Sequence, residues 1–219
     1  MPSSKNIAKA MLFAAGRGER LRPLTDKTPK PLLPIGEKPI IDYSLAYLKK
    51  NGVEEVVINL HHLGAKIKQH VGEGKKYGLR IYYSEEEKLL GTGGGLKKAE
   101  AHFKNETAFF TLNSDTLINC DLKELTEFHY SQNRPATLVV APWQEGYTKI
   151  EGKYLFTGLA VWGPVIFQEL TPSPSNLITG CGLARSVFVH DGLWIDIGTK
   201  ETYQKAQETW AAGHHQRLA

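Results

Sequence analysis

The chain has 219 residues, of which 41% are hydrophobic and 23% are charged, and its formal net charge is +4. This length predicts a single domain with a sizeable core, and the composition is that of an ordinary soluble globular protein. Basic and acidic residues are interspersed along the chain. This distribution argues against a nucleic-acid-binding protein, which would gather its basic residues into a stripe.

The cysteines and the apolar segments indicate the compartment. Cys120 and Cys181 are the only cysteines, and neither has the partners that a zinc site requires. Two isolated cysteines in a chain of this length are typical of a reducing environment. No apolar run reaches the roughly 20 residues that span a bilayer, and the one near the start is too short for a signal peptide. We therefore expect a cytoplasmic protein that binds neither membranes nor nucleic acid.

Strand and helix patterns alternate through the first two thirds of the chain. Apolar runs bounded by turn residues predict strands, and apolar residues at three- and four-residue spacing predict helices. The predicted strands are 10–15, 53–60, 79–84, 108–112 and 137–142, and the predicted helices are 40–50, 64–71, 94–102 and 121–130. This alternation predicts an α/β fold with a Rossmann-like, doubly wound, mostly parallel sheet covered by helices on both faces.

The alternation weakens after Trp143. A strand is predicted over 154–162, and the last helix over 200–211. Between them, residues 186–197 read as a β-hairpin with Asp191-Gly192 at its turn. This part predicts a small β-rich insert in the α/β domain.

The first predicted strand runs into a glycine-rich turn that is followed by cations. Backbone N–H groups in such a turn can bind phosphate. Neither the GxxxxGK[ST] pattern nor GxGxxG is complete, because no Gly-Lys follows Gly16 at the required spacing and Leu21 stands where the third glycine of GxGxxG would be. A GxG turn alone is often only a tight turn, and a lone lysine is often only solvated. Arg20, Arg22 and the proline-flanked Lys30 together make a polyphosphate ligand the better joint explanation.

Two aspartates stand in sequence contexts that suit a metal ion. Asp115 closes the triplet Asn-Ser-Asp after the predicted strand 108–112, and ligands of open α/β sheets bind outside the carboxyl ends of the strands. Asp196 lies between two isoleucines, where a carboxylate is costly unless it is paired, bound to metal or on the wet face of an alternating strand. Two aspartates on separate strands are a usual way to hold Mg²⁺.

Five segments, in this order, resemble the sugar-1-phosphate nucleotidylyltransferases: AAGRGERLRPLT, PKPLLPIGEKPII, LLGTGGGL, NSD and WIDIGT. The resemblance extends from about Lys9 to Thr209. It implies a Mg²⁺-dependent reaction in which an NTP and a sugar 1-phosphate give an NDP-sugar and pyrophosphate. It also implies a single domain over 1–219, with a nucleotide-binding core at about 9–142, a reduced sugar-binding part at about 143–195, and a metal motif and C-terminal helix at 194–212. Either a monomer or a homodimer is compatible with it.

The resemblance assigns roles to individual residues. Arg20 would clamp the pyrophosphate leaving group, Lys30 would neutralise the α-phosphate, and Asp115, the third residue of the catalytic set, would hold the metal with Asp196. The nucleotide would contact Ala14, Ala15, Gly16, Arg17, Gly18, Glu19, Glu86, Gly91, Thr92, Gly93, Asn113 and Ser114. The sugar would contact Phe156, Thr157 and Gly158.

Within that family, the chain most resembles the short uridylyltransferases that act on N-acetylmuramic acid 1-phosphate. Its brevity, the segment VINLHHLG and the run TGGG are the reasons. UTP is therefore the favoured nucleotide. A GDP- or dTDP-sugar-forming transferase acting on mannose, heptose or glucose 1-phosphate is an alternative. A nucleotide-binding regulator without turnover is another, although retention of every expected charged group argues against it.

The sugar-binding part departs from the family pattern. The stretch between Asp115 and Asp196 is short, and an acidic residue that the family often has after its FTG-like segment lacks a clear counterpart. Lys149 and Lys153 could replace a phosphate-binding lysine, but surface lysines are more often solvated. Loop histidines are more often structural than functional. We therefore expect a structural role for His61 and His62.

Overall fold

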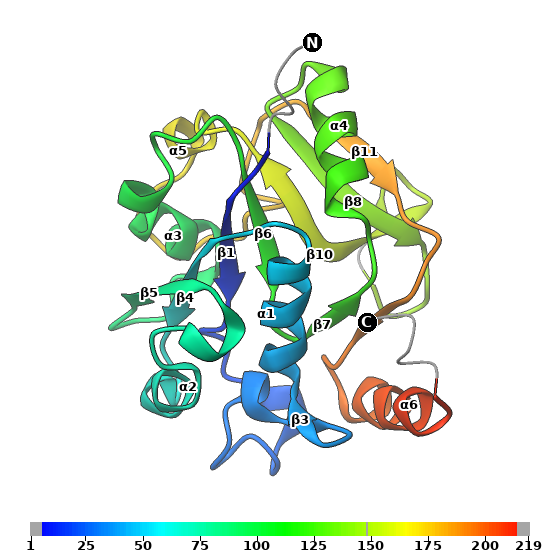
Figure 1. The fold of residues 1–219 in the computed structure, drawn as a ribbon. Coiled ribbons are helices and arrows are strands. Elements are labelled where there is room, and N and C mark those ends of the chain that lie inside the picture. The colour runs from blue at the N-terminus through cyan, green and yellow to red at the C-terminus, as the bar shows by residue number, and fades with distance from the viewer. Residues whose placement is uncertain (1–5, 148, 214–219) are drawn as a thin grey trace.

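The computed structural model describes residues 6–147 and 149–213, and its centre is one large twisted sheet (Figure 1). Residues 1–5, which belong to the segment considered for a signal peptide, lie outside the described part. The strands are β1 Lys9–Phe13, β2 Pro34–Ile35, β3 Lys38–Pro39, β4 Glu55–Leu60, β5 Arg80–Glu85, β6 Phe109–Asn113, β7 Thr116–Ile118, β8 Ala136–Pro142, β9 Lys149–Ile150, β10 Tyr154–Trp162, β11 Arg185–Val189 and β12 Trp194–Asp196.

The large sheet is mostly parallel, as the sequence predicts. Its strands lie in the order β11-β8-β10-β6-β1-β4-β5, and β9 pairs with β10 beside this path. β1 runs parallel to β4 and β6, β4 to β5, and β8 to β11. β10 runs antiparallel to its neighbours β6 and β8. The carboxyl ends of β1, β4, β5 and β6 therefore meet at one edge, where ligands of such sheets bind.

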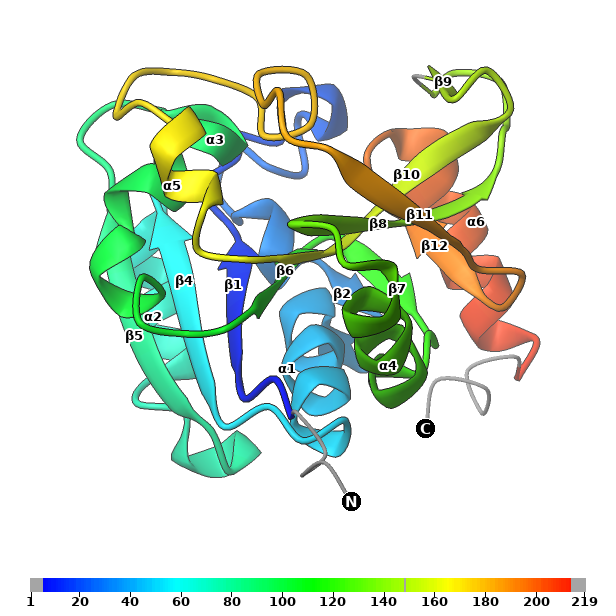
Figure 2. The same ribbon diagram turned by 90° about the horizontal axis from the view of Figure 1, so that it is seen from above.

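Helices cover both faces of the sheet. Their bounds are α1 Ile40–Lys50, α2 Gly64–Val71, α3 Gly91–Lys98, α4 Leu122–Gln132, α5 Ile166–Glu169 and α6 Lys200–Ala211. α1, α2 and α4 pack on one face, and α3 and α5 on the other (Figures 1 and 2). Within the described residues, no helix is long and apolar enough to cross a lipid bilayer.

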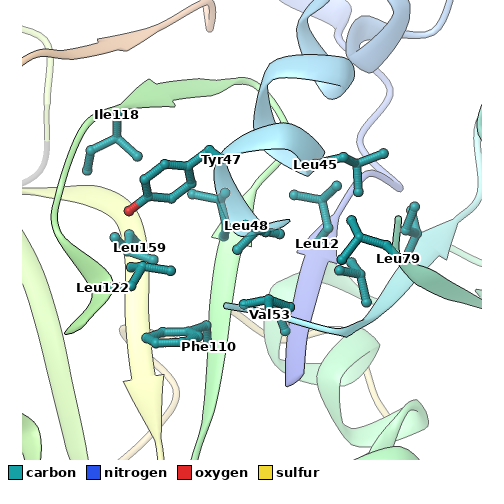
Figure 3. Close-up of a cluster of buried hydrophobic side chains, with 14 of the residues drawn as sticks. Leu12, Leu45, Tyr47, Leu48, Val53, Leu79, Phe110, Ile118, Leu122 and Leu159 are labelled. Carbon is teal, nitrogen blue, oxygen red and sulfur yellow. The ribbon is translucent and has the colours of Figure 1, made fainter. Parts of the chain in front are cut away.

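The core divides between the two faces because successive strand residues point in opposite directions. On β1, Leu12 belongs to the cluster under α1, whereas Met11 belongs to the cluster under α3. Figure 3 shows Leu12 beside Leu45 and Leu48 of α1, with Phe110 of β6 below them. These four side chains are at most 1% exposed. Their packing fixes the parallel strands whose ends carry the candidate site.

The helix ends follow recognisable local signals. The predicted helices 40–50, 64–71 and 200–211 are confirmed to the residue. α4 begins where the Asp121 carboxylate accepts the backbone N–H groups of Lys123 and Glu124, and α6 begins with a capping box between Thr199 and Thr202. α3 begins at Gly91, three residues before its predicted start, so the glycines of LGTGGGL belong to a helix and not to a loop.

The hairpin predicted over 186–197 is wrong. β11 pairs in parallel with β8 inside the large sheet, and β12 pairs antiparallel with β7 outside it. An Asp-Gly dipeptide between apolar runs is a short-range hairpin signal, but both flanking strands have partners far away in the sequence. β7 and β12 together form what we call the β7–β12 ribbon, in which Asp196 lies opposite Thr116. α6 packs next to this ribbon through Leu117, Ile197 and Ala206.

Candidate active site

A cavity of about 270 Å³ opens at the carboxyl edge of the parallel strands. Its walls are Phe13, Ala14, Ala15, Gly16, Lys30, Pro31, Asn59, Leu89, Gly91, Thr92, Asn113, Ser114 and Asp115. Most of the residues expected to bind a nucleotide therefore come together there. A larger groove of about 840 Å³ lies between α1, the β2–β3 hairpin and α6. That groove holds none of the expected site residues, so the smaller cavity is the candidate site.

The glycine-rich loop after β1 is held by specific contacts. The Ala14 N–H donates to Asn59 Oδ1 at 2.8 Å. Gly18 has a φ of +65°, and a Cβ at that position would lie 2.8 Å from the Thr25 side chain, so only glycine fits without movement. The loop thus has a defined shape. By contrast, Arg17 and Glu19 are exposed and pair with each other at 3.6 Å.

Lys30 and Asp115, which the sequence could not connect, form an ion pair at the cavity. Their side chains are 14% and 20% exposed. Lys30 opens a short 3₁₀ turn between Pro29 and the buried Pro31, so its backbone direction is fixed by both prolines. Asp115 follows Ser114, whose hydroxyl donates to the Phe13 carbonyl at 2.6 Å. The ammonium and the carboxylate are therefore each positioned by their own loop.

Asp196 and Arg20 lie at the same end of the β7–β12 ribbon as Asp115. The N–H of Ile197 donates to the Asp115 carbonyl at 3.0 Å, which places the two aspartates next to each other across the ribbon. Asp196 Oδ1 accepts the Gly198 N–H at 2.8 Å. A Cβ at Gly198 would lie 3.1 Å from both Asp196 Oδ1 and Arg20 Nη2. Two carboxylates and two cations thus gather at one place.

Tyr147 is a residue of this site that the sequence did not reveal. Burial, followed by the Asp196 carboxylate that its hydroxyl contacts, raises the pKa of Tyr147 above its ordinary value, and Asp115 adds to this effect. Its ring packs edge-on against Trp194 of β12 with 5.3 Å between the centroids. Tyr147 therefore remains a protonated hydrogen-bond donor to Asp196. It lies in an irregular segment with no periodic signal, and only the folded chain brings it over the ribbon.

Two of the three α3 residues expected at the base and ribose line the cavity, and the third does not. Gly91 and Thr92 line the cavity, and the Thr92 hydroxyl accepts the Leu177 N–H at 2.9 Å. Gly93 faces the segment 171–177 instead, because a Cβ there would lie 2.5 Å from Ser175 Oγ. The glycines of α3 therefore let this segment pack closely on the helix.

Glu86 is covered by protein atoms. The residue is 5% exposed. Its Oε1 accepts the Asn59 side-chain amide at 2.7 Å, and its Oε2 accepts the Leu90 N–H at 2.9 Å. Both carboxylate oxygens are therefore engaged inside the protein.

The segment expected to contact the sugar lies beside the cavity on β10. Gly158 has a φ of +93°, and a Cβ there would lie 2.8 Å from the Asn113 side chain, so glycine permits this close approach. The Thr157 hydroxyl points into the sheet and donates to the Val139 carbonyl at 2.8 Å. Phe156 packs at the edge of the apolar cluster under α3. Gly158 is thus the member of this trio that directly abuts the cavity wall.

The other polar residues considered from the sequence have protein contacts. Lys149 Nζ lies 4.2 Å from the Trp143 ring centre, and Lys153 Nζ lies 5.1 Å from the ring centre of the adjacent tyrosine. The His61 ring bonds to the Glu86 carbonyl at 2.9 Å, and the His62 ring to the Thr25 carbonyl at 3.4 Å. The two histidines tie loops together. None of these four residues lines the cavity.

The donor atoms suit Mg²⁺. Asp115, just before β7, and Asp196, at the end of β12, supply hard carboxylate oxygens. The described residues hold no group of three or more His, Cys, Asp or Glu side chains that could bind a metal ion. Mg²⁺ is usually bound by one or two carboxylates and completes its shell with substrate phosphates and water. A closed structural zinc site would need four protein ligands. The pair therefore fits a metal that is shared with a phosphorylated ligand.

Comparisons with known proteins agree with this geometry. The family model described as "Nucleotidyl transferase" matches residues 9–149. The chain is 34% identical to an N-acetylmuramate alpha-1-phosphate uridylyltransferase from Neisseria meningitidis serogroup B, over 91% of this chain and 96% of that protein. It is 36% identical to a UTP–glucose-1-phosphate uridylyltransferase from Synechocystis over 60% of this chain, but it spans only 36% of that relative's length.

A solved structure has the same fold. The crystal structure of HddC from Yersinia pseudotuberculosis superposes with a TM-score of 0.78 at 21% sequence identity. The match covers 93% of this chain and all of that chain (100%). The likeness therefore concerns the fold of nearly the whole chain.

Proposed function

This chain belongs to the nucleotidyl transferase family of enzymes, and we propose that it transfers a nucleotidyl group from an NTP to a sugar 1-phosphate, giving an NDP-sugar and pyrophosphate. The observation that carries the proposal is that Arg20, Asp115 and Asp196 gather at one end of the β7–β12 ribbon, where Asp115 pairs with Lys30 on the cavity wall. We propose UTP and N-acetylmuramic acid 1-phosphate as the substrate pair.

The reaction needs charge and positioning more than it needs a base. A phosphate oxygen of the sugar 1-phosphate is already anionic at neutral pH, so it can attack the α-phosphorus without losing a proton to a side chain. A new bond forms between that oxygen and the α-phosphorus as the bond to pyrophosphate breaks, and pyrophosphate leaves with the electron pair. The protein must hold two polyanions in line, and positioning of this kind supplies roughly 7–11 kcal/mol.

The charged residues divide this task. Lys30 lies against Asp115 at the cavity wall, so an α-phosphate beside Asp115 is within reach of the same ammonium. Arg20 lies against Gly198 close to Asp196, and its planar guanidinium suits the departing pyrophosphate. Asp115 and Asp196 would hold Mg²⁺, which supplies positive charge to the phosphate oxygens. Removing one such cation from a transition state typically costs about 2.7–4 kcal/mol.

Two observations support the proposed substrate pair. The Neisseria relative matches over 96% of its own length, and its name specifies a uridylyl group and N-acetylmuramate 1-phosphate. The second is the segment VINLHHLG and the run TGGG of this sequence, by which it resembles the short uridylyltransferases.

Pyrophosphate release tests the proposal. UTP, GTP, dTTP and CTP are each offered with Mg²⁺ and the 1-phosphates of N-acetylmuramic acid, N-acetylglucosamine, glucose, mannose and heptose. We expect the highest kcat/KM with UTP and N-acetylmuramic acid 1-phosphate. A higher value with GTP and a mannose or heptose phosphate would overturn the pair and leave the transferase assignment intact. Nucleotide binding by calorimetry without any turnover would instead indicate a regulator.

A further inference from the structure

We propose that Asn59 and Glu86 are positioning residues for the nucleotide. They form a buried hydrogen-bonded unit that fixes the loop after β1 against the start of α3, and the Glu86 carboxylate does not contact the ligand. The inference rests on the proposed function in one respect, namely that an NTP binds in the cavity. It assigns a new role to Asn59 and a different one from the family expectation to Glu86.

The hydrogen bonds of Asn59 have an unambiguous direction. The residue is 2% exposed and lies at the carboxyl end of β4. The Ala14 N–H can only donate, so the atom that faces it at 2.8 Å must be the carbonyl oxygen of the Asn59 side chain. The Asn59 NH₂ group then faces Glu86 Oε1 at 2.7 Å, where a carboxylate accepts. Each end of the amide therefore has one suitable partner.

Glu86 continues this chain of hydrogen bonds to α3. Its Oε2 accepts the N–H of Leu90, the residue that immediately precedes the helix. Among the ion pairs of the described residues, none includes Glu86, so hydrogen bonds alone compensate its burial. The path from Ala14 through Asn59 and Glu86 to Leu90 links the ends of β1, β4 and β5 to α3.

The backbone of α3 closes the unit from the remaining side. A Cβ at Gly95 would lie 2.6 Å from Glu86 Oε1 and 2.9 Å from the Asn59 side-chain nitrogen. The space between Gly95 and Glu86 is therefore too small for a carbon atom, so a ligand atom cannot reach Glu86 from this direction. The carboxylate is thus enclosed by Asn59, Leu90 and Gly95.

The linked segments are the ones that form the cavity. Ala14, Gly91 and Thr92 belong to its wall, as does Asn59 itself. If the hydrogen-bonded path is broken, the loop after β1 and the start of α3 are free to move apart, and binding must then order them. Ordering lowers affinity, and buried polar groups that are left unsatisfied destabilise the segments that carry them. A broken path is therefore expected to weaken NTP binding.

An exchange of the two side-chain types tests this role. Asn59→Asp puts a second carboxylate against Glu86, and Glu86→Gln leaves a donor facing either Asn59 or the Leu90 N–H. In the double variant N59D/E86Q, the new carboxylate accepts from Ala14 and from the glutamine NH₂ group, and the glutamine oxygen accepts from Leu90. All three hydrogen bonds return, and the net charge equals that of the wild type.

Calorimetry with UTP and Mg²⁺ measures the effect, and steady-state kinetics separates KM from kcat. We expect each single variant to raise the Kd and KM for UTP at least about tenfold, with a smaller change in kcat, and the double variant to return within threefold of wild type. Glu87→Gln, which removes the same charge from the exposed neighbouring residue, serves as the matched control and should bind normally.

The opposing outcomes are distinct. If the Glu86 carboxylate contacts the base or ribose, the double variant will regain wild-type melting temperature yet still bind UTP as weakly as Glu86→Gln, and the inference fails. Unchanged affinity in both single variants also overturns it. If the wild-type protein binds no NTP, the proposed function fails instead.

Hydrogen–deuterium exchange on the wild type gives a check that needs no variant to fold. The Ala14 and Leu90 amides should be protected before nucleotide is added, because each donates to a buried acceptor. If the Ala14 and Leu90 amides exchange as fast as exposed loop amides, the two hydrogen bonds do not link these segments and the inference fails.

Discussion

Lys30 and Arg20 each lie close to one of the two aspartates of the candidate site. Lys30 is flanked by two prolines and pairs with Asp115, and Arg20 lies against Gly198 beside Asp196. At the scale of single residues, we expect Lys30→Ala or Arg20→Ala to lower kcat for pyrophosphate release at least about a hundredfold, since one lost transition-state cation costs about 2.7–4 kcal/mol. Circular dichroism should show an intact fold.

Lys27→Ala is the matched control for these variants. Lys27 is exposed in the same loop as Lys30 and has no assigned role, so its loss should leave kcat near the wild-type value. Near-normal kcat in Lys30→Ala or Arg20→Ala would remove that residue from the proposed mechanism.

At the scale of elements, α4 is joined to β8 by a buried histidine. His129 is 5% exposed, and its Nδ1 lies 2.9 Å from the Thr137 hydroxyl. Burial lowers the pKa of His129 below its ordinary value of 6.5. In the unfolded chain, a histidine titrates near about 6.5, so below that pH the unfolded state binds more protons than the folded state. Stability therefore falls as the pH drops through this range, and it is fully retained above it.

Urea denaturation at pH 7.5 and pH 5.5 measures this loss. We expect the wild type to lose more unfolding free energy between these two values than His129→Gln, whose amide can keep the bond to Thr137 without titrating. His102→Gln, a change at a less buried histidine, should lose as much as the wild type. An equal loss in the wild type and His129→Gln would show that the α4–β8 contact is not the pH-sensitive element.

At the scale of the whole molecule, the proposed ligands bind where distant parts of the chain converge. A ligand present at a hundred times its Kd stabilises the folded state by about 2.7 kcal/mol. In a chain of this size, that amount raises Tm by roughly 5–11 °C. We expect UTP with Mg²⁺ to produce such a shift, Asp196→Asn to reduce it, and EDTA to abolish pyrophosphate release.

Asp191→Asn provides the comparison, because it removes an exposed carboxylate from the same part of the chain. Its thermal shift with UTP and Mg²⁺ should match that of the wild type. Turnover that survives EDTA, or an undiminished shift in Asp196→Asn, would contradict metal binding at the ribbon.

Local patterns predicted much of this architecture. The boundaries of α1, α2, β10 and α6 follow from periodicity and turn residues, because those signals lie within each element. The mostly parallel sheet follows from the alternation of strands and helices. The pairing of β11 with β8 and of β12 with β7 could not be read in this way, since it joins strands far apart in sequence. The Asp191-Gly192 signal therefore misled the prediction.

The candidate site also has features that the local sequence predicts and features that depend on residues far apart in the chain. The glycine loop and both aspartates stand out as residue types at strand ends, and the structure brings them together. The pairing of Lys30 with Asp115, the contact of Tyr147 with Asp196 and the enclosure of Glu86 by Asn59 are products of tertiary packing. A residue's type predicts which chemistry it can perform. Its contacts decide whether it binds a ligand itself or positions another residue that does.

The β7–β12 ribbon also has a consequence for how such enzymes diversify. Asp115 and Asp196 are kept adjacent by strand pairing, so their spacing does not depend on the length of chain between them. Doubling a flexible connection costs only about 0.6 kcal/mol. Under the proposed function, the acceptor-binding stretch can therefore lengthen, shrink or be exchanged for that of a longer relative, provided Tyr147 is kept, while the metal-holding carboxylates stay in register. Acceptor choice and nucleotidyl transfer can then evolve separately within one chain.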